Sequence, residues 1–304
     1  YVYSCKSGIV NSRFRVVKRG VLCYNIHMNI RVSVSILACK LSRRMIRLLG
    51  RGGTDLPGRI ALKLCPNLLG VLAKNVTTVI VTGTNGKTTT VCLLKSLLEK
   101  AGHKVGLIGT IQNMIGDRAL PAARTTPDTY ELQSLFALMV AEGCDCCVME
   151  VSSHALAQER VAGCHFEVAV FTNLTQDHLD YHGTMENYLA AKKRLFTMCN
   201  TAVVNADDPH AAALTAGLSC PVLRYSADDD TADFTAKNIR HLPDGVRFEL
   251  IAGTKIGRIH LHIPGQFSVY NGMATAAAAL TLGLPFDTCL LYTSPSPRDG
   301  LLSR

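Results

Sequence analysis

The sequence lacks an apolar run as long as the roughly 18 residues that a membrane-spanning helix needs. Its first residues also lack the apolar stretch and small-residue cleavage site of a signal peptide. Hydrophobic residues nevertheless make up 48% of the 304 positions, and charged residues make up 18%. The composition therefore excludes wholesale disorder and predicts a packed, cytoplasmic protein with one large domain or two modest ones.

A disulfide framework is not expected either, because the twelve cysteines are scattered along a long chain. Cys146 and Cys147 lie in an apolar run that is typical of a buried strand. This placement favours a reducing compartment. Cys144 and Cys147 overlap this expected buried strand and are not expected to form a zinc ribbon, so Zn²⁺ is a weaker candidate than Mg²⁺ for any metal site.

Acidic residues are nearly missing from residues 1–75, which hold fourteen Lys and Arg residues and a single acidic residue, Asp55. The rest of the chain is close to neutral. A basic arm of this kind could bind nucleic acid or an anionic membrane surface. Alternatively, the arm is not native to the body. Within it, residues 35–49 have the apolar spacing of a helix, with Lys and Arg between.

Residues 76–220 alternate short apolar runs with amphipathic helical patterns. The expected strands are 76–82, 104–110, 146–152, 167–174 and 201–207, and the expected helices are 88–101, 128–142 and 185–196. This alternation predicts an α/β fold, with a mostly parallel sheet and helices on both faces. Residues 221–263 are typical of short strands around the turn at Pro243–Gly245, which predicts a small antiparallel patch. Residues 266–284 are expected to be helical.

A glycine-rich loop follows the first expected strand, in the sequence Gly83-Thr84-Asn85-Gly86-Lys87-Thr88. Glycines allow backbone N–H groups to face phosphate oxygens, and the following helix N-terminus favours negative charge. Lys87 supplies a charge for the β- and γ-phosphates, and the Thr88 hydroxyl can bind Mg²⁺. The spacing is shorter than the common G-x-x-x-x-G-K-[ST], but its strand–loop–helix context favours a nucleotide site.

Ionisable side chains follow two further strands at the same expected sheet edge. Glu150 ends one strand, where a buried carboxylate is costly unless it meets a cation. His154 comes shortly after it, and Asp177, His178, Asp180 and His182 come just beyond the next strand. Each could be structural, but together they indicate a functional site. Lys192, on the helix after them, is by itself expected to be a solvated lysine.

Five ordered stretches resemble the Mur ligases: GTNGKTTT (83–90), TTPD (125–128), MEVSSHALAQERV (149–161), TNLTQDHLDYHGTMENYLAAKKRLF (172–196) and VNADD (204–208). The resemblance covers about residues 77–285. It is strongest to the branch that adds the third amino acid of the peptidoglycan stem. It implies the family's central ATPase domain, whereas the N-terminal uridine-binding and C-terminal domains are not recognisable.

The resemblance also implies roles for individual residues. The ATP loop would be Gly83, Thr84, Asn85, Gly86, Lys87, Thr88 and Thr89, with Asn271 near the adenine. The UDP-muramoyl dipeptide would be held by Thr125, Thr126, Ser152, Gln158 and Arg160. Mg²⁺ would be bound by Thr88, Glu150, His178 and a carbamylated Lys192, so that Lys87, His178 and Lys192 would be catalytic. Ser268 departs from the family pattern F-N-V-x-N.

The resemblance implies ATP-dependent amide formation through an acyl phosphate. The substrates would be UDP-N-acetylmuramoyl-L-alanyl-D-glutamate and an amino acid, diaminopimelate or lysine. A monomer without a nucleic-acid partner is expected. One alternative is the ligase subunit of lipid II isoglutaminyl synthase, which predicts a four-cysteine zinc ribbon that this chain lacks. The other alternative is a nucleotide-binding fragment without catalysis.

Both ends differ from the body. Residues 40–83 resemble the start of the isoglutaminyl synthase subunit, and the switch falls in the shared GTNGKTTT stretch, which predicts a chimera. Residues 289–304 include CLLYTSPSPRD, which resembles a translated sequencing adapter. The expected division is a basic segment at 1–75, a central ATPase domain at 76–285 and an artefactual tail at 286–304. Residues 1–40 and 289–304 are expected to pack poorly.

Overall fold

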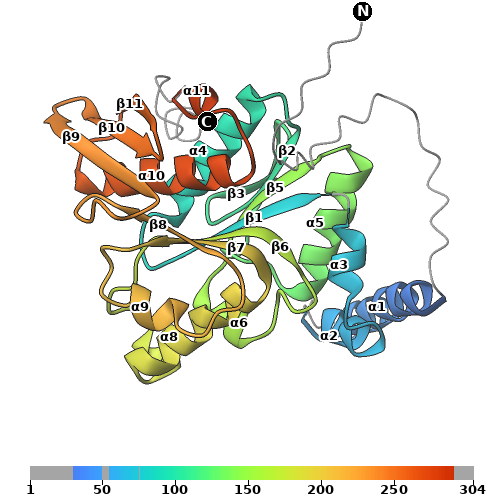
Figure 1. The fold of residues 1–304 in the computed structure, drawn as a ribbon. Helices are drawn as coiled ribbons and strands as arrows, with labels where there is room; N and C mark the ends of the chain where they lie inside the picture. Colours follow the sequence, from blue (N-terminus) through green and yellow to red (C-terminus); the bar gives the residue numbers. More distant parts are fainter. Residues whose placement is uncertain (1–29, 50–54, 75, 291–304) are drawn as a thin grey trace, which may run out of the picture.

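The computed structural model describes residues 30–49, 55–74 and 76–290. A mixed sheet lies at its centre (Figure 1). In spatial order its strands are β11 (Lys255–Leu261), β10 (Gly245–Ala252), β9 (Phe234–Leu242), β8 (Val222–Ser226), β7 (Cys199–Asn205), β6 (Phe166–Phe171), β1 (Thr77–Thr82), β5 (Cys146–Glu150), β2 (Val105–Ile108), β3 (Gln112–Ile115) and β4 (Arg118–Pro121).

Neighbouring strands pair in parallel from β9 through β8, β7, β6, β1 and β5 to β2. At the two ends of the sheet, β11–β10–β9 and β2–β3–β4 pair antiparallel. The predicted α/β class, with a parallel sheet and a small antiparallel patch, is confirmed. The patch begins later than predicted, because β8 pairs in parallel with β7. A second hairpin, β3–β4, turns at Gly116, whose φ of 57° suits glycine. Sequence analysis missed this hairpin.

Helices cover both faces of the sheet. One face packs against α4 (Lys87–Lys100), α10 (Gln266–Thr281) and α11 (Phe286–Cys289). The other packs against α3 (Leu68–Leu72), α5 (Thr129–Ala141), α6 (Ser153–Ala157), α8 (Met185–Lys193), the short 3₁₀ helix Arg194–Thr197 and α9 (Ala211–Thr215). A further short helix, α7 (Leu179–His182), precedes α8.

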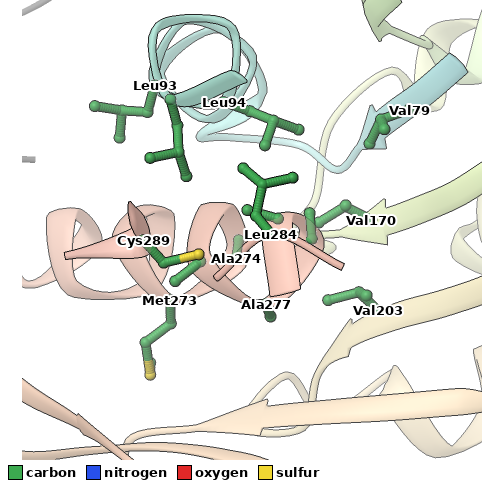
Figure 2. Close-up of a cluster of buried hydrophobic side chains, with 14 of the residues drawn as sticks. Val79, Leu93, Leu94, Val170, Val203, Met273, Ala274, Ala277, Leu284 and Cys289 are labelled. Carbon is green, nitrogen blue, oxygen red and sulfur yellow. The ribbon is translucent and has the colours of Figure 1, made fainter. Parts of the chain in front are cut away.

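Alternation along β1 explains why the middle of the strand, Val79–Val81, is apolar at consecutive positions. Val79 and Val81 belong to the core cluster under α4 and α10, whereas Ile80 belongs to the cluster on the opposite face. Figure 2 shows Val79 on the same side as Leu94 of α4 and Ala277 of α10. A strand that is buried on both faces needs apolar residues at every position, as is typical of parallel sheets.

Two further helices, α1 (Ile30–Leu48) and α2 (Asp55–Leu64), pack beside α5 (Figure 1). Val32 and Cys39 of α1 are buried in a small cluster with residues of α2 and α3. The expectation that residues 1–40 pack poorly is therefore wrong for these side chains, and residues 1–29 lie outside the described residues. A separate origin for residues 1–75 stays a prediction.

The start of the expected tail also packs on the body. Cys289 is buried beside α10 (Figure 2). Phe286 is buried in the same cluster, and Leu290 packs against that cluster. The expectation of poor packing is wrong at Cys289, because this side chain is fully buried in the apolar cluster around α4 and α10. Residues 291–304 lie outside the described residues. Within the described ranges, no helix is long and apolar enough to span a bilayer.

Candidate active site

The carboxyl ends of four adjacent strands, β6, β1, β5 and β2, meet at one edge of the sheet. In parallel α/β sheets, ligands bind at this edge. β1 runs into the glycine-rich loop, β5 ends at Glu150, and β2 ends two residues before Thr110. The fold therefore brings together groups that lie far apart in the sequence.

The loop from Gly83 joins β1 to the N-terminus of α4, as predicted. Gly86, at the N-cap of α4, has a φ of 82°. This left-handed conformation is unfavourable for any residue that has a side chain. The loop is fixed from the β6 side, because Asn173 accepts from the Asn85 N–H at 2.9 Å and Thr172 donates to the Asn85 carbonyl at 2.7 Å. It is thus a shaped backbone cradle at a helix N-terminus.

Lys87 folds back over this loop. Its Nζ donates to the carbonyl oxygens of Gly83 at 2.9 Å and Thr84 at 2.8 Å. Burial lowers the pKa of Lys87, and the nearby carboxylates of Glu150 and Asp177 oppose that shift. The ammonium group is therefore held at the loop where phosphate oxygens would lie.

Glu150 is fully buried and is held by three donors. Its carboxylate accepts from Thr88 Oγ1 at 3.1 Å, from the Thr110 N–H at 2.9 Å and from Thr110 Oγ1 at 2.9 Å. In the part of the chain that the structure describes, no Lys or Arg forms an ion pair with it. A buried carboxylate without such a partner suits a bound cation.

Lys192 points inward to the loop and is only 1% exposed. Its Nζ donates to the Gly83 carbonyl at 3.0 Å and more weakly to Thr82 Oγ1 at 3.4 Å. Burial, and then the charge of Lys87, lower the pKa of Lys192 well below its ordinary value, while Asp177 opposes this. The prediction that Lys192 faces the phosphate loop is confirmed, and the alternative of a solvated lysine is wrong.

His178 lies in a cluster of rings on the β6 side of the site. Its ring centroid is 4.8 Å from that of His154 and 6.1 Å from that of Tyr188. The Tyr188 hydroxyl lies 3.2 Å from Thr84 Oγ1, and its ring lies 4.8 Å below Lys192 Nζ. His178 thus adjoins the loop through Tyr188, and its side chain is 42% exposed.

The five residues assigned to the dipeptide form one network beside Glu150. Thr126 Oγ1 donates to the Glu150 carbonyl at 3.0 Å and accepts from the Ser152 N–H at 3.0 Å. Arg160 donates to the Thr126 carbonyl at 2.8 Å and to Gln158 at 2.6 Å.

Two outer members complete this network. Thr125 Oγ1 lies 3.1 Å from Thr110 Oγ1, and it can donate to that oxygen because the Thr110 hydroxyl donates to Glu150. Gln158 lines a hollow of about 780 Å³ together with Arg59, Lys63 and Thr129. These residues are therefore together in space, whereas their role in substrate binding stays a prediction.

Asn271 comes from α10, far along the chain, yet it lies against the loop. A Cβ at Gly86 would lie 2.3 Å from Asn271 Oδ1, so a side chain there would force Asn271 to shift. The Asn271 side chain is 3% exposed, and its Nδ2 is buried without a partner among the described residues. Ser268, the departure from the family pattern, is buried and donates to the Pro264 carbonyl at 3.4 Å.

These observations fit a nucleotide, and they fit Mg²⁺ in part. The cradle at Gly86 and the orphaned amide of Asn271 suit a nucleotide with its phosphates on the helix N-terminus. The oxygens of Thr88 and Glu150 suit Mg²⁺, which prefers oxygen ligands. The ammonium group of Lys192 does not fit a cation site unless it is modified.

Two clusters of potential metal ligands lie elsewhere in the described ranges, namely His103, Asp145 and Cys146, and Asp244, His260 and His262. Neither includes Glu150 or His178, so His178 as a ligand stays a prediction.

Sequence analysis missed two residues of the site. Thr110 holds Glu150 through two hydrogen bonds, and its place after the end of β2 was a signal that could have found it. Tyr188 contacts both Thr84 and Lys192 and stacks on His182. Its helical spacing gave no such signal, because a buried Tyr at that position is equally expected in a core.

Comparison with known proteins agrees with this site. Residues 81–279 match the Mur ligase middle domain. The chain belongs to the Mur ligase family. The match spans more than half of the chain and includes the loop from Gly83, Glu150, Lys192 and Asn271.

The most similar relatives found are named UDP-N-acetylmuramoyl-L-alanyl-D-glutamate–2,6-diaminopimelate ligases. The protein of Caldanaerobacter subterraneus subsp. tengcongensis is 47% identical over 224 residues, or 73% of this chain, and that of Clostridium botulinum is 43% identical over 222 residues. The chain spans only 46% of the length of each of these Mur ligases.

Solved structures lead to the same family. A structure of a ligase with the same name has a TM-score of 0.66 at 31% identity, covering 80% of this chain and 49% of that one. MurF from Acinetobacter baumannii has a TM-score of 0.61 at 21% identity over 78% of this chain, which shows the common fold alone.

Proposed function

We propose that the chain carries the ATP-binding catalytic centre of a Mur ligase that adds the third amino acid to UDP-N-acetylmuramoyl-L-alanyl-D-glutamate. The observation that carries this proposal is the convergence of Lys87 and Lys192 on the phosphate loop beside the buried carboxylate of Glu150. The names of the relatives supply the substrate class. A cytoplasmic location and a monomeric state stay predictions.

The chemistry follows from the low reactivity of a carboxylate toward an amine. The terminal carboxylate of the dipeptide would attack the γ-phosphoryl group of ATP, giving an acyl phosphate and ADP. The amino group of the incoming amino acid would then displace phosphate and form the amide. Lys87 would stabilise charge on the transferring phosphoryl group, and its contact with the Gly83 carbonyl in the loop supports this role.

The residues of this chain would hold Mg²⁺ through Thr88 and Glu150, with a carbamylated Lys192 as a further ligand. The ion would supply charge neutralisation on the phosphate and carboxylate oxygens. Carbamylation requires an uncharged amine, and the lowered pKa of Lys192 favours that form. The neutral amine of Lys192 would form an N–C bond with CO₂ and release one proton, which leaves a carbamate anion with two oxygens in place of the amine.

Phosphate release from ATP tests the proposal. It should require both UDP-N-acetylmuramoyl-L-alanyl-D-glutamate and an amino acid, and parallel assays with diaminopimelate and lysine would identify the amino acid. ATP turnover that ignores both substrates would contradict the proposed function.

A second candidate is a nucleotide-binding fragment without ligase activity, which is favoured by the coverage of only 46% of each relative. Tight binding of a non-hydrolysable ATP analogue without any phosphate release in the presence of both substrates would support it. The four-cysteine ribbon of the isoglutaminyl synthase alternative has no counterpart among the metal-ligand clusters of the described residues.

A further inference from the structure

Helix α1 exposes a continuous row of apolar side chains. We call Ile30, Val34, Leu37, Leu41, Met45 and Leu48 the apolar stripe; each is between 49% and 81% exposed. Their spacing of three or four residues places them on one side of the helix. A helix of 19 residues is about 28 Å long, so the stripe extends over several turns. Soluble proteins rarely expose such a continuous apolar row to solvent unless it contacts a partner or a membrane.

Contacts on the opposite face of α1 hold the helix against the body, so that the apolar stripe faces outward. Val32 and Cys39 are buried against the body, and the Cys39 thiol contacts Gln133 Oε1 of α5 at 3.9 Å. The guanidinium of Arg43 lies 4.2 Å from the centre of the Tyr130 ring, also in α5. The helix therefore cannot turn the stripe inward without breaking these contacts. Figure 1 shows α1 at the outer edge of the molecule, beyond α3 and α5.

The charges around the stripe have one sign. Lys40, Arg44 and Arg47 are exposed on one flank of it, and residues 30–54 contain no acidic residue. A second copy of α1 would bring a like-charged flank against this one. Residues 1–29 also contain basic residues and no acidic ones. Repulsion between like charges therefore disfavours a second copy of α1, or residues 1–29, as the partner that covers the stripe. An anionic surface would instead attract the basic flank.

We propose that α1 lies on an anionic membrane surface, with the apolar stripe at the boundary between headgroups and acyl chains. An exposed apolar row flanked by Lys and Arg is the pattern of helices that lie in the membrane interface. Anionic lipids attract such basic side chains, and the apolar side chains leave water. This binding requires no membrane-spanning helix and would place the catalytic domain at the bilayer.

Vesicle sedimentation with the full chain tests this proposal. The chain should sediment with vesicles of phosphatidylcholine and phosphatidylglycerol and stay in solution with phosphatidylcholine alone. Leu41→Asp should reduce the bound fraction strongly, whereas Ile256→Asp, at a similarly exposed aliphatic residue of β11, should not. Lys40→Glu with Arg44→Glu should weaken binding at least about tenfold, and high salt should mimic that loss.

Several results would overturn the proposal. These are failure of the folded chain to bind anionic vesicles, equal binding to neutral vesicles, and equal loss in Leu41→Asp and Ile256→Asp. A concentration-dependent dimer in light scattering that Leu41→Asp abolishes would assign the stripe to a second copy instead. Thermal unfolding of each variant confirms that it is folded, and Leu37→Ser provides a milder change at the same stripe.

Discussion

Lys87 and Lys192 donate to the same acceptor, the carbonyl oxygen of Gly83. Two ammonium groups at one carbonyl repel each other, and Lys192 is the more deeply buried of the two. The repulsion therefore acts on top of the desolvation of Lys192, and both effects favour its uncharged amine. This arrangement explains how an inward-facing lysine could become a carboxylate-like ligand.

The first prediction concerns stability and pH. The pKa of Lys192 is lower in the folded state than its ordinary value of 10.5, so the unfolded chain binds this proton more tightly. The free energy of unfolding should therefore fall as the pH drops from about 10.5 toward the pKa of the folded state. The total loss is about 1.4 kcal/mol for each unit by which folding lowers the pKa. Methionine has a volume similar to that of lysine but no titrating proton. The Lys192→Met variant should therefore be more stable than the wild-type chain at pH 7 in CO₂-free buffer.

Urea unfolding at pH 7, 8 and 9 measures this difference. The advantage of Lys192→Met should shrink as the pH rises toward 10.5, because the unfolded lysine carries a proton that is lost on folding, and removing that proton costs less free energy at higher pH. Lys193→Met is the matched control, since Lys193 is the neighbouring residue and donates instead to the carbonyls of Ala213 and Ala216. A gap that stays constant with pH would show that Lys192 is not the titrating group.

The second prediction concerns carbamylation itself. With ¹³C-labelled bicarbonate, the wild-type chain should show a carbamate carbon signal by NMR, and Lys192→Ala should not. The same substitution should lower ligation at least about 100-fold, because it removes one proposed metal ligand. Lys193→Ala should keep the signal. A carbamate signal that survives in Lys192→Ala would assign the modification to another residue.

The third prediction concerns Glu150. Glu150→Gln keeps the shape of the side chain but removes the negative charge that Thr88 and Thr110 now hold in place. We expect the Mg²⁺-dependent affinity for an ATP analogue to fall at least about tenfold, with little change in the affinity measured in EDTA. Titration calorimetry with and without Mg²⁺ measures both values.

Glu142→Gln, on the exposed end of α5, serves as the charge-matched control. An equal loss of affinity with and without Mg²⁺ would mean that Glu150 supports the loop and does not bind the ion.

The sequence predicted the parallel core well because β1, β5 and β6 are apolar on both faces and alternate with amphipathic helices. It failed at β3 and β4, which are short and half-exposed, so their residues carry little periodicity. Only the Gly116–Asp117 turn indicated that hairpin.

The site shows a similar division. The loop from Gly83 and Glu150 could be predicted from local motifs, since the loop directly follows a strand and Glu150 ends one. The contact between Asn271 and Gly86 could not be derived from spacing, because it joins helices α4 and α10 across the core. The inward direction of Lys192 depends likewise on how α8 packs, and the resemblance predicted it where periodicity indicated a solvated lysine.

The last prediction uses that contact between helices. Gly86→Ala would place a Cβ 2.3 Å from Asn271 Oδ1 and keep an unfavourable φ of 82°, so both the loop and Asn271 must shift. Gly102→Ala is the matched control, because Gly102 has a φ of 93° but no atom within 4 Å of the new Cβ. Both variants should lose roughly 1–2 kcal/mol of stability through backbone strain. Only Gly86→Ala should also weaken binding of an ATP analogue, because only there does the change move a group that faces the nucleotide. Equal affinities for the two variants would place the nucleotide away from Asn271.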